Sequence, residues 1–316
     1  MNPSAEASEK HEGRLPNLII PGAAKAGTTT IHHLLAQHPQ VFLPRVKEPH
    51  FFSNDLVWER GVEAYVQTHF EGAAGFSVRA EATPHYLYYE KAARRIAEVL
   101  PASHQRFLIV LRDPVARAYS LYWNMVHEGH ETLSFEDALA REDGREGIRE
   151  IERLGGIRWQ YYNSGLYAKQ LECWFRYFTR ARFLFILTED LQADPVGTMD
   201  RVFGFLGLAP LESLDAAPKN TAALPRSRAL QHFMRRPNRI RRLLGTLVPD
   251  RWKVDIAEQI LRANRRRFEY PPMHAKTECV LRERFASDVD QLQSLIERDL
   301  SAWLPPARGA LERIER

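Results

Sequence analysis

The sequence has few cysteines and no long apolar run. Only Cys173 and Cys279 occur in its 316 residues, too few for a disulfide framework and without metal-ligand spacing. We therefore expect both to be buried apolar filler in a protein of a reducing compartment, the cytoplasm. Residues 1–14 are polar and mixed in charge, without the apolar core of a signal peptide or membrane anchor. This predicts a soluble chain whose residues 1–14 form a disordered tail.

The sequence does have the composition of an ordinary globular protein. Hydrophobic residues make up 44% and charged residues 27%, a balance that allows a sizeable core. No linker divides residues 15–316, which predicts a single domain with a core over 15–210 and a largely helical remainder over 211–316. The net charge of +4 is modest, but arginines gather over residues 226–267. Such a cluster indicates either a solvated helix face or a site for an anionic partner.

Short apolar runs alternate with stretches of helical spacing. Strands are predicted where these runs occur, at residues 18–20, 76–80, 107–111 and 183–187. After the run 107–111, Asp113 suits a helix N-cap and Pro114 the first helical position. This order predicts an α/β fold with a parallel sheet flanked by helices on both faces, and with ligands at the carboxyl ends of the strands. A closing helix is predicted from apolar residues at helical spacing: Leu281, Phe285, Val289, Leu292, Ile296 and Leu300.

A glycine-containing loop joins the first predicted strand to the first predicted helix. Its backbone N–H groups and the positive end of the helix favour a phosphate or sulfate ligand. Gly22 and Gly27 have the Walker A separation, but Thr28 stands where that motif requires lysine, and Lys25 comes two residues before the second glycine. A lysine this early lies nearer the first bridging oxygen than the β- and γ-phosphates. ATP chemistry is therefore disfavoured.

A second polar motif follows the strand at residues 107–111. The strand delivers Arg112 to the sheet edge, and Asp113, Arg117 and Ser120 recur on one face of the next helix. Arg112 and Ser120 should therefore converge. A guanidinium and a hydroxyl are suitable donors for a phosphate monoester.

With these two motifs the chain resembles the family of sulfotransferases that use 3'-phosphoadenosine 5'-phosphosulfate (PAPS). It looks most like the branch with the heparan sulfate sulfotransferases and many bacterial sulfotransferases. The likeness runs from about residue 15 through 203–207, more weakly to the end, and includes no Golgi membrane anchor. It implies a P-loop-type sheet and transfer of a sulfuryl group from PAPS, as co-substrate and without a metal, to a hydroxyl or amine. The acceptor would be a carbohydrate, lipid or small molecule.

The resemblance also indicates which residues of this chain would bind the nucleotide. Those around the 5'-phosphosulfate would be Lys25, Ala26, Gly27, Thr28, Thr29 and Thr30, with Lys25 also catalytic. Arg112 and Ser120 would bind the 3'-phosphate that distinguishes PAPS from ATP. In the part after residue 210, a loop would close over the nucleotide and hold the 3'-phosphate through Arg226, Ser227 and Arg228.

On the acceptor side, the resemblance makes Glu48 the general base. His50 is a rival, because the unperturbed pKa of histidine suits proton abstraction at neutral pH. Residues expected to contact the acceptor are Glu48, His50, Phe51, His85 and Tyr86, although core packing is an equally open reading of the tyrosines Tyr86, Tyr88 and Tyr89. Ala82 stands where the heparan sulfate enzymes have lysine, so their polysaccharide specificity does not transfer. Residues 132–156 are predicted to be a helical insertion that forms an acceptor edge or a solvated face.

Two other functions are open from the sequence. A P-loop kinase or nucleotidase acting on ATP would use Asp113 or Asp190 as its acidic metal residue. A non-enzymatic module would grip an anionic partner through residues 226–267. We expect the enzyme, with no nucleic-acid partner and no membrane span; the acceptor, O- or N-sulfation and the oligomeric state are open.

Overall fold

The computed structural model describes residues 11–216, 223–225, 265–267 and 270–306. Its centre is a parallel sheet with the strand order β2-β3-β1-β4-β5. The strands are β1 (Leu18–Gly22), β2 (Val41–Phe42), β3 (Val78–Ala82), β4 (Phe107–Leu111) and β5 (Phe183–Leu187). The prediction of a parallel sheet is confirmed, but the strand expected at residues 76–80 begins and ends later, as β3.

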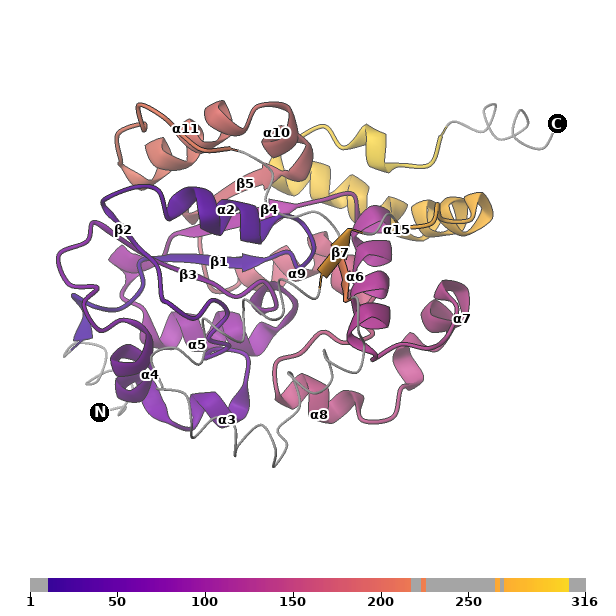
Figure 1. Ribbon diagram of the computed structural model, residues 1–316, viewed down its shortest axis with the longest axis horizontal. Helices are drawn as coiled ribbons and strands as arrows, with labels where there is room; N and C mark the ends of the chain where they lie inside the picture. The colour runs from indigo at the N-terminus through magenta and orange to yellow at the C-terminus, as the bar shows by residue number, and fades with distance from the viewer. Residues whose placement is uncertain (1–10, 217–222, 226–264, 268–269, 307–316) are drawn as a thin grey trace.

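Helices cover both faces of this sheet, as predicted (Figure 1). On one face lie α2 (Thr28–Leu35), α10 (Thr188–Ala193) and α11 (Pro195–Leu206). The other carries α5 (Glu90–Val99) and α9 (Tyr167–Phe175), which contact each other. The remaining α-helices are α3 (Asp55–Trp58), α4 (Gly61–His69), α6 (Pro114–Glu128), α7 (Phe135–Ala140), α8 (Ile148–Arg153) and α15 (Ala275–Ile296). Short 3-10 turns include η1 (Tyr86–Tyr88) and η4 (Asn163–Gly165).

The core joins the sheet to the C-terminal helix. Trp174 of α9 is fully buried, meets Phe107 of β4 edge to face, and donates its indole N–H to the Leu87 carbonyl at 3.1 Å. Helix α15 packs on α9 and α6. The predicted apolar stripe is confirmed on α15 for five buried residues: Leu281, Phe285, Val289, Leu292 and Ile296. Leu300 is buried too, but it lies beyond the end of the helix.

The order of the strands brings two loops together. β1 has β3 on one side and β4 on the other: the chain runs from β1 to β2 and β3 on one side, then crosses to β4 and β5 on the other. In open α/β sheets such a switch point leaves a crevice at the carboxyl ends of the strands. Here the loop after β1 and the segment after β4 flank that crevice. Both predicted anion-binding motifs lie there.

Three expectations need revision or lie outside the described residues. Residues 11–14 belong to the folded body, because the N–H groups of Arg14 and Leu15 donate to the His11 carbonyl and His11 is buried. Cys173 and Cys279 are unpaired but only partly buried, so they are not core filler. Arg226, Ser227 and Arg228 lie outside the described part of the chain.

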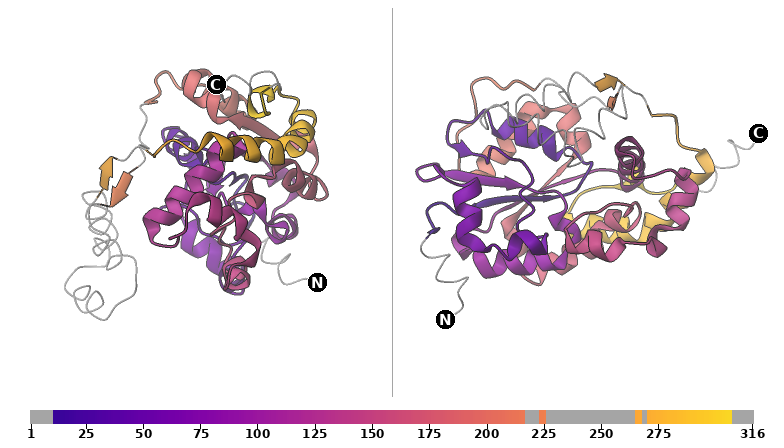
Figure 2. Two further views of the ribbon diagram at one scale, coloured as in Figure 1. Left: turned by 90° about the vertical axis from the view of Figure 1, so that its right-hand side faces the viewer. Right: turned by 60° about the horizontal axis from the view of Figure 1, so that its bottom comes forward.

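A short antiparallel ribbon borders the undescribed residues. It pairs β6 (Ala223–Pro225) with β7 (Arg265–Arg267), and Figure 2 shows it to one side of the main body. In the described ranges, no helix has the length and apolar character needed to cross a membrane.

Candidate functional site

The loop between β1 and α2 requires both of its glycines, for different reasons. A Cβ on Gly22 would lie 2.7 Å from the Leu87 Cβ, so only glycine lets β1 approach η1 this closely. Gly27 is the N-cap of α2 and has a φ of 105°, a left-handed conformation that favours glycine. Beyond it, the N–H groups of Thr28 and Thr29 precede the first intrahelical bonds of α2, whereas the Thr30 N–H donates to the Gly27 carbonyl at 2.9 Å. The loop is therefore built to receive an anion.

Lys25 is held at both ends by the segment that follows β4. Its backbone is left-handed with a φ of 69°, and its carbonyl accepts a hydrogen bond from Arg112 Nη1 at 3.2 Å. Its ammonium donates to Asn124 Oδ1 of α6 at 2.9 Å. The pKa of Lys25 is lowered, mainly by burial and further by the charges of Arg112 and Lys47, against the opposing effects of Glu128 and Glu48.

Of the other residues in and after this loop, some are buried and bonded within the protein, and one has an exposed hydroxyl. Ala26 is fully buried; its N–H donates to the Ala23 carbonyl, and its carbonyl accepts from Thr188 Oγ1 at 2.7 Å. Thr28 is also buried, whereas the Thr29 hydroxyl is exposed and accepts from Lys47 Nζ at 3.2 Å. The N–H of Ala26 is thus already used, so we assign this residue a loop-shaping role.

Arg112 and Ser120 lie on the neighbouring strand-to-helix segment, as predicted. Asp113 caps α6 by accepting from Val115 N at 2.8 Å, which confirms the expected helix start. The Arg112 carbonyl accepts from the Tyr167 hydroxyl at 3.0 Å, which gives Tyr167 a positioning role. Arg117 is fully buried and donates to the Tyr161 carbonyl, so it belongs to the core and not to the donor group; Ser120 is also buried, at 7% exposed.

Sequence reasoning missed Tyr270, which completes this group. Its ring stacks on Trp123 of α6, with centroids 5.7 Å apart and planes 7° from parallel. Burial raises the pKa of Tyr270, while a hydrogen bond with Ser120 and the charge of Arg112 lower it. The Tyr270 hydroxyl therefore lies close to both Arg112 and Ser120. Nothing in the sequence around Tyr270 links it to a helix so far away along the chain.

Glu48 and His50 lie in the loop before α3, both with left-handed backbones of φ 61° and 56°. Glu48 pairs with Lys47 at 2.6 Å and lies 3.9 Å from His50 Nε2. The rings of His50 and His85 are 5.0 Å apart. A carboxylate, a lysine and two histidines therefore form one polar cluster.

The electrostatics of this cluster distinguish the two candidate bases. Burial alone would raise the pKa of Glu48, but Lys47, His85 and His50 together lower it, so the carboxylate is ionised. Burial and the neighbouring His85 lower the pKa of His50 to about 4. The reason for preferring His50, an unperturbed pKa near neutrality, is therefore wrong for this site. Alanine at position 82 carries no charge, so the positive contact to Glu48 comes from Lys47 instead.

Two predicted acceptor contacts are core residues instead. Phe51 is 1% exposed and stacks on Tyr65 with ring centroids 4.2 Å apart. Tyr86 is fully buried, and its hydroxyl accepts from the Phe52 N–H at 3.2 Å. Among the three tyrosines, Tyr88 alone is half-buried rather than buried. We therefore assign Phe51 and Tyr86 to packing under the site.

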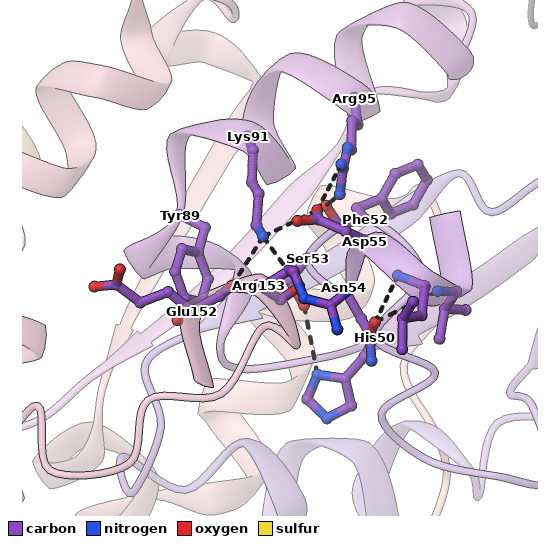
Figure 3. Close-up of polar contacts among 12 residues, drawn as sticks. His50, Phe52, Ser53, Asn54, Asp55, Tyr89, Lys91, Arg95, Glu152 and Arg153 are labelled. Atoms are coloured by element: carbon purple, nitrogen blue, oxygen red, sulfur yellow. Dashed lines mark hydrogen bonds and ion pairs between the residues drawn. The ribbon is translucent and has the colours of Figure 1, made fainter. Parts of the chain in front are cut away.

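Residues 132–156 form the predicted helical insertion, and its end reaches the acceptor side. The Gly155 carbonyl bonds His85 Nδ1 at 3.1 Å. Lys91 Nζ donates to the Glu152 carbonyl at 2.8 Å and to Asp55 at 3.0 Å, as Figure 3 shows. Helix α8 is thereby tied to the segment that carries His50.

Beside this junction lies a cavity of about 1070 Å³ between α5, α8 and α9. Tyr88 lines it together with acidic and basic side chains in nearly equal number. The basic ones are Lys91, Arg149, Arg153, Lys169 and Arg176. Lys25 and Glu48 do not line it, so this cavity is separate from the anion loop.

The acids required by an ATP enzyme are engaged elsewhere. Asp113 pairs with Arg282 at 3.0 Å, and Asp190 forms two hydrogen bonds with Arg298 at 2.8 and 2.9 Å. Within the ranges that the structure describes, no group of three or more His, Cys, Asp or Glu residues is arranged to hold a metal ion.

Comparison with known proteins agrees with this geometry. A family model described as "Sulfotransferase domain" matches residues 15–223. Human heparan sulfate glucosamine 3-O-sulfotransferase 6 is 35% identical over 202 residues, which cover 64% of this chain and 55% of that protein. Human bifunctional heparan sulfate N-deacetylase/N-sulfotransferase 3 is 30% identical over 213 residues, 65% of this chain and 24% of that protein. The chain thus spans about half, or less, of the length of these relatives.

The fold also matches a solved structure over nearly its whole length. A sulfotransferase from Alicyclobacillus acidocaldarius is 30% identical with a TM-score of 0.67, covering 92% of this chain and 98% of that one.

The histidine environments predict acid sensitivity. Burial lowers the pKa of His32 and of His50 from 6.5 to about 4. Between about pH 6.5 and pH 4 the unfolded chain binds protons that the folded chain does not, so stability falls as the pH falls through this window. Replacing His50 by glutamine should remove up to about 1.4 kcal/mol per pH unit of this slope.

Urea unfolding midpoints at about pH 7 and pH 5 measure this slope, with the exposed His274→Gln as a matched control. A slope in His50→Gln equal to that of the unaltered protein would contradict the assignment.

Proposed function

The chain belongs to the sulfotransferase domain family, and from this premise we propose that it transfers a sulfuryl group from PAPS to a hydroxyl or amine of an acceptor. PAPS is the co-substrate that membership of the family implies. The proposed binding residues are Lys25 and the α2 N-terminus for the 5'-phosphosulfate, and Arg112 with Ser120 for the 3'-phosphate.

The observation that carries this proposal is the hydrogen bond of Arg112 Nη1 to the Lys25 carbonyl, at 3.2 Å. It joins the two donor groups at one edge of the sheet. A guanidinium has five N–H donors, so Arg112 retains others for a phosphate. The donor set therefore fits a nucleotide with anionic groups at both its 5' and 3' positions, which distinguishes it from ATP.

The proposed reaction is an in-line transfer. A bond forms between the acceptor oxygen or nitrogen and sulfur, while the bond from sulfur to the phosphate oxygen breaks and adenosine 3',5'-bisphosphate leaves. Glu48 takes the acceptor's proton. Lys25 and the loop N–H groups stabilise the charge that grows on the leaving phosphate, an effect worth about 3–4 kcal/mol per donor.

Glu48 is favoured over His50 by its surroundings. Lys47 lowers the pKa of Glu48 and keeps it ionised, whereas burial and His85 lower the pKa of His50 to about 4. The left-handed backbones of Glu48 and His50 are typical of functional sites but do not distinguish the two residues. A carboxylate with a low pKa is a weak base. The contribution of Glu48 to catalysis therefore depends on its position relative to the acceptor and to Lys25.

We propose a carbohydrate as the acceptor class to test first. The support is the similarity to enzymes named for heparan sulfate glucosamine. Ala82, which stands where the heparan sulfate enzymes have lysine, argues against assuming a highly sulfated polysaccharide. The unpaired state of Cys173 and Cys279 supports a cytoplasmic location, which we also propose.

Removal of the Lys25 ammonium should abolish most turnover. With sulfur-labelled PAPS and a panel of cell extracts to supply the acceptor, Lys25→Ala should lower kcat about 100- to 1,000-fold and weaken PAPS binding far less. The exposed Lys276→Ala is the control and should retain full activity. Near-normal turnover in Lys25→Ala would refute the assignment, and strict magnesium dependence would favour an ATP enzyme.

The 3'-phosphate site is testable by binding alone. Ser120→Ala should weaken binding of adenosine 3',5'-bisphosphate about 10- to 100-fold and leave adenosine 5'-monophosphate unaffected. Arg112→Ala also removes the hydrogen bond to the Lys25 carbonyl, so it should weaken binding of both nucleotides, and of the bisphosphate more. Isothermal titration calorimetry measures both ligands, with the exposed Arg94→Ala as control. Equal losses for the two nucleotides would place the 3'-phosphate elsewhere.

The two candidate bases predict different kinetics. Glu48→Gln should lower kcat about 100- to 10,000-fold at an unchanged KM for PAPS, and His50→Gln less than about tenfold. Because Lys47 lowers the pKa of Glu48, Lys47→Met should move the acid limb of the kcat–pH profile upward. The reverse order of losses would make His50 the base.

A further inference from the structure

Asn124 contacts the proposed catalytic lysine but belongs to none of the motifs. It lies one helical turn beyond Ser120 on α6, and its Oδ1 accepts from Lys25 Nζ at 2.9 Å. The same helix buries Leu121, Tyr122 and Met125 in the core, whereas Asn124 is half-buried. Its amide therefore projects to the anion loop and not into the packing of α6.

The chemistry of an amide suits this contact. An ammonium has three donors, and one hydrogen bond to Asn124 leaves two for an anion in the loop. The amide oxygen is neutral, so it orients the ammonium without cancelling its charge. A carboxylate in this place would compete with the anion for the lysine.

We propose that Asn124 is a positioning residue that aims the Lys25 ammonium into the β1–α2 loop while preserving its positive charge for sulfuryl transfer. This inference rests on the proposed function. Arg112 fixes the backbone of Lys25 and Asn124 fixes its side chain, so one strand-to-helix unit holds the lysine at both ends.

Other charges also act on Lys25 and must be separated from Asn124. Glu128 follows on α6, Arg112 comes directly after β4, and Lys47 and Glu48 act on the lysine from the loop before α3. Two are acidic and two are basic, so their effects oppose one another. The amide is the neutral acceptor that the structure adds to this group.

Three substitutions test the role through activity. Asn124→Leu keeps the approximate size but removes the acceptor, and should lower kcat about 10- to 100-fold with a KM for PAPS within about threefold. Asn124→Gln retains the amide and should recover part of this loss. Asn124→Asp should also lower kcat, because its carboxylate neutralises the ammonium. Met125→Leu, one residue away but directed into the core, is the matched control and should keep full activity.

A second readout needs no sulfuryl transfer. The pH dependence of acetic anhydride labelling at Lys25, followed by peptide mass spectrometry, reports when the ammonium loses its proton. Its midpoint should move down by about one pH unit in Asn124→Leu and up in Asn124→Asp. The alkaline limb of the kcat–pH profile should move in the same two directions. Thermal unfolding identifies any variant that fails to fold.

Opposite shifts in the two variants support the positioning role, whereas a scaffold role predicts no shift or the same shift in both. Unchanged midpoints together with unchanged kcat in Asn124→Leu would overturn the inference. If the protein does not turn over PAPS but the labelling midpoints still move in opposite directions, the proposed function fails and the Asn124–Lys25 contact stands.

Discussion

The burial of one lysine is the constraint around which the anion site is organised. An ammonium removed from water is unstable unless acceptors or an anion compensate for the lost hydration. The Lys25 ammonium donates to a single amide at 2.9 Å, and burial together with Arg112 and Lys47 lowers its pKa although Glu128 and Glu48 act to raise it. Such an arrangement holds a cation that is only partly compensated. In the proposed enzyme an anionic ligand would complete the compensation, and the loop, β4 and α6 would then form one site.

The backbone conformations single out the same loops as the charges do. Lys25, Glu48 and His50 are left-handed without being glycine. They come from two loops, the one before α2 and the one before α3, and Lys47 of the second loop donates to the Thr29 hydroxyl at the start of α2. Such conformations cost roughly 1–3 kcal/mol and persist where the surroundings impose them. Here Arg112 holds the Lys25 carbonyl and Lys47 holds the Glu48 carboxylate. These two contacts therefore hold a cation and a base in the constant positions that the proposed transfer needs.

The accuracy of the sequence predictions follows from how local each pattern is. Phe107–Leu111 and Phe183–Leu187 are continuous apolar runs, and their strands begin and end where predicted. β3 contains Arg79 and Glu81, which are buried and form hydrogen bonds there. Because these polar residues interrupt the apolar pattern, the strand was predicted two residues too early. β2 has two residues, too few for any periodicity. Phe51 and Tyr86 follow recognisable motifs, yet an aromatic side chain fits a binding wall and a core equally well until its neighbours are known.

The sequence by itself determined the parallel α/β sheet, the glycine loop with its displaced lysine, the cap at Asp113 and the stripe of the closing helix. Each depends on neighbours a few residues apart. Only the tertiary structure decided that Asn124 holds Lys25 across 99 positions, that Tyr270 joins Ser120, and that burial removes the pKa advantage of His50. Those properties depend on distances and solvent exclusion created when separate elements pack, and no local pattern encodes them.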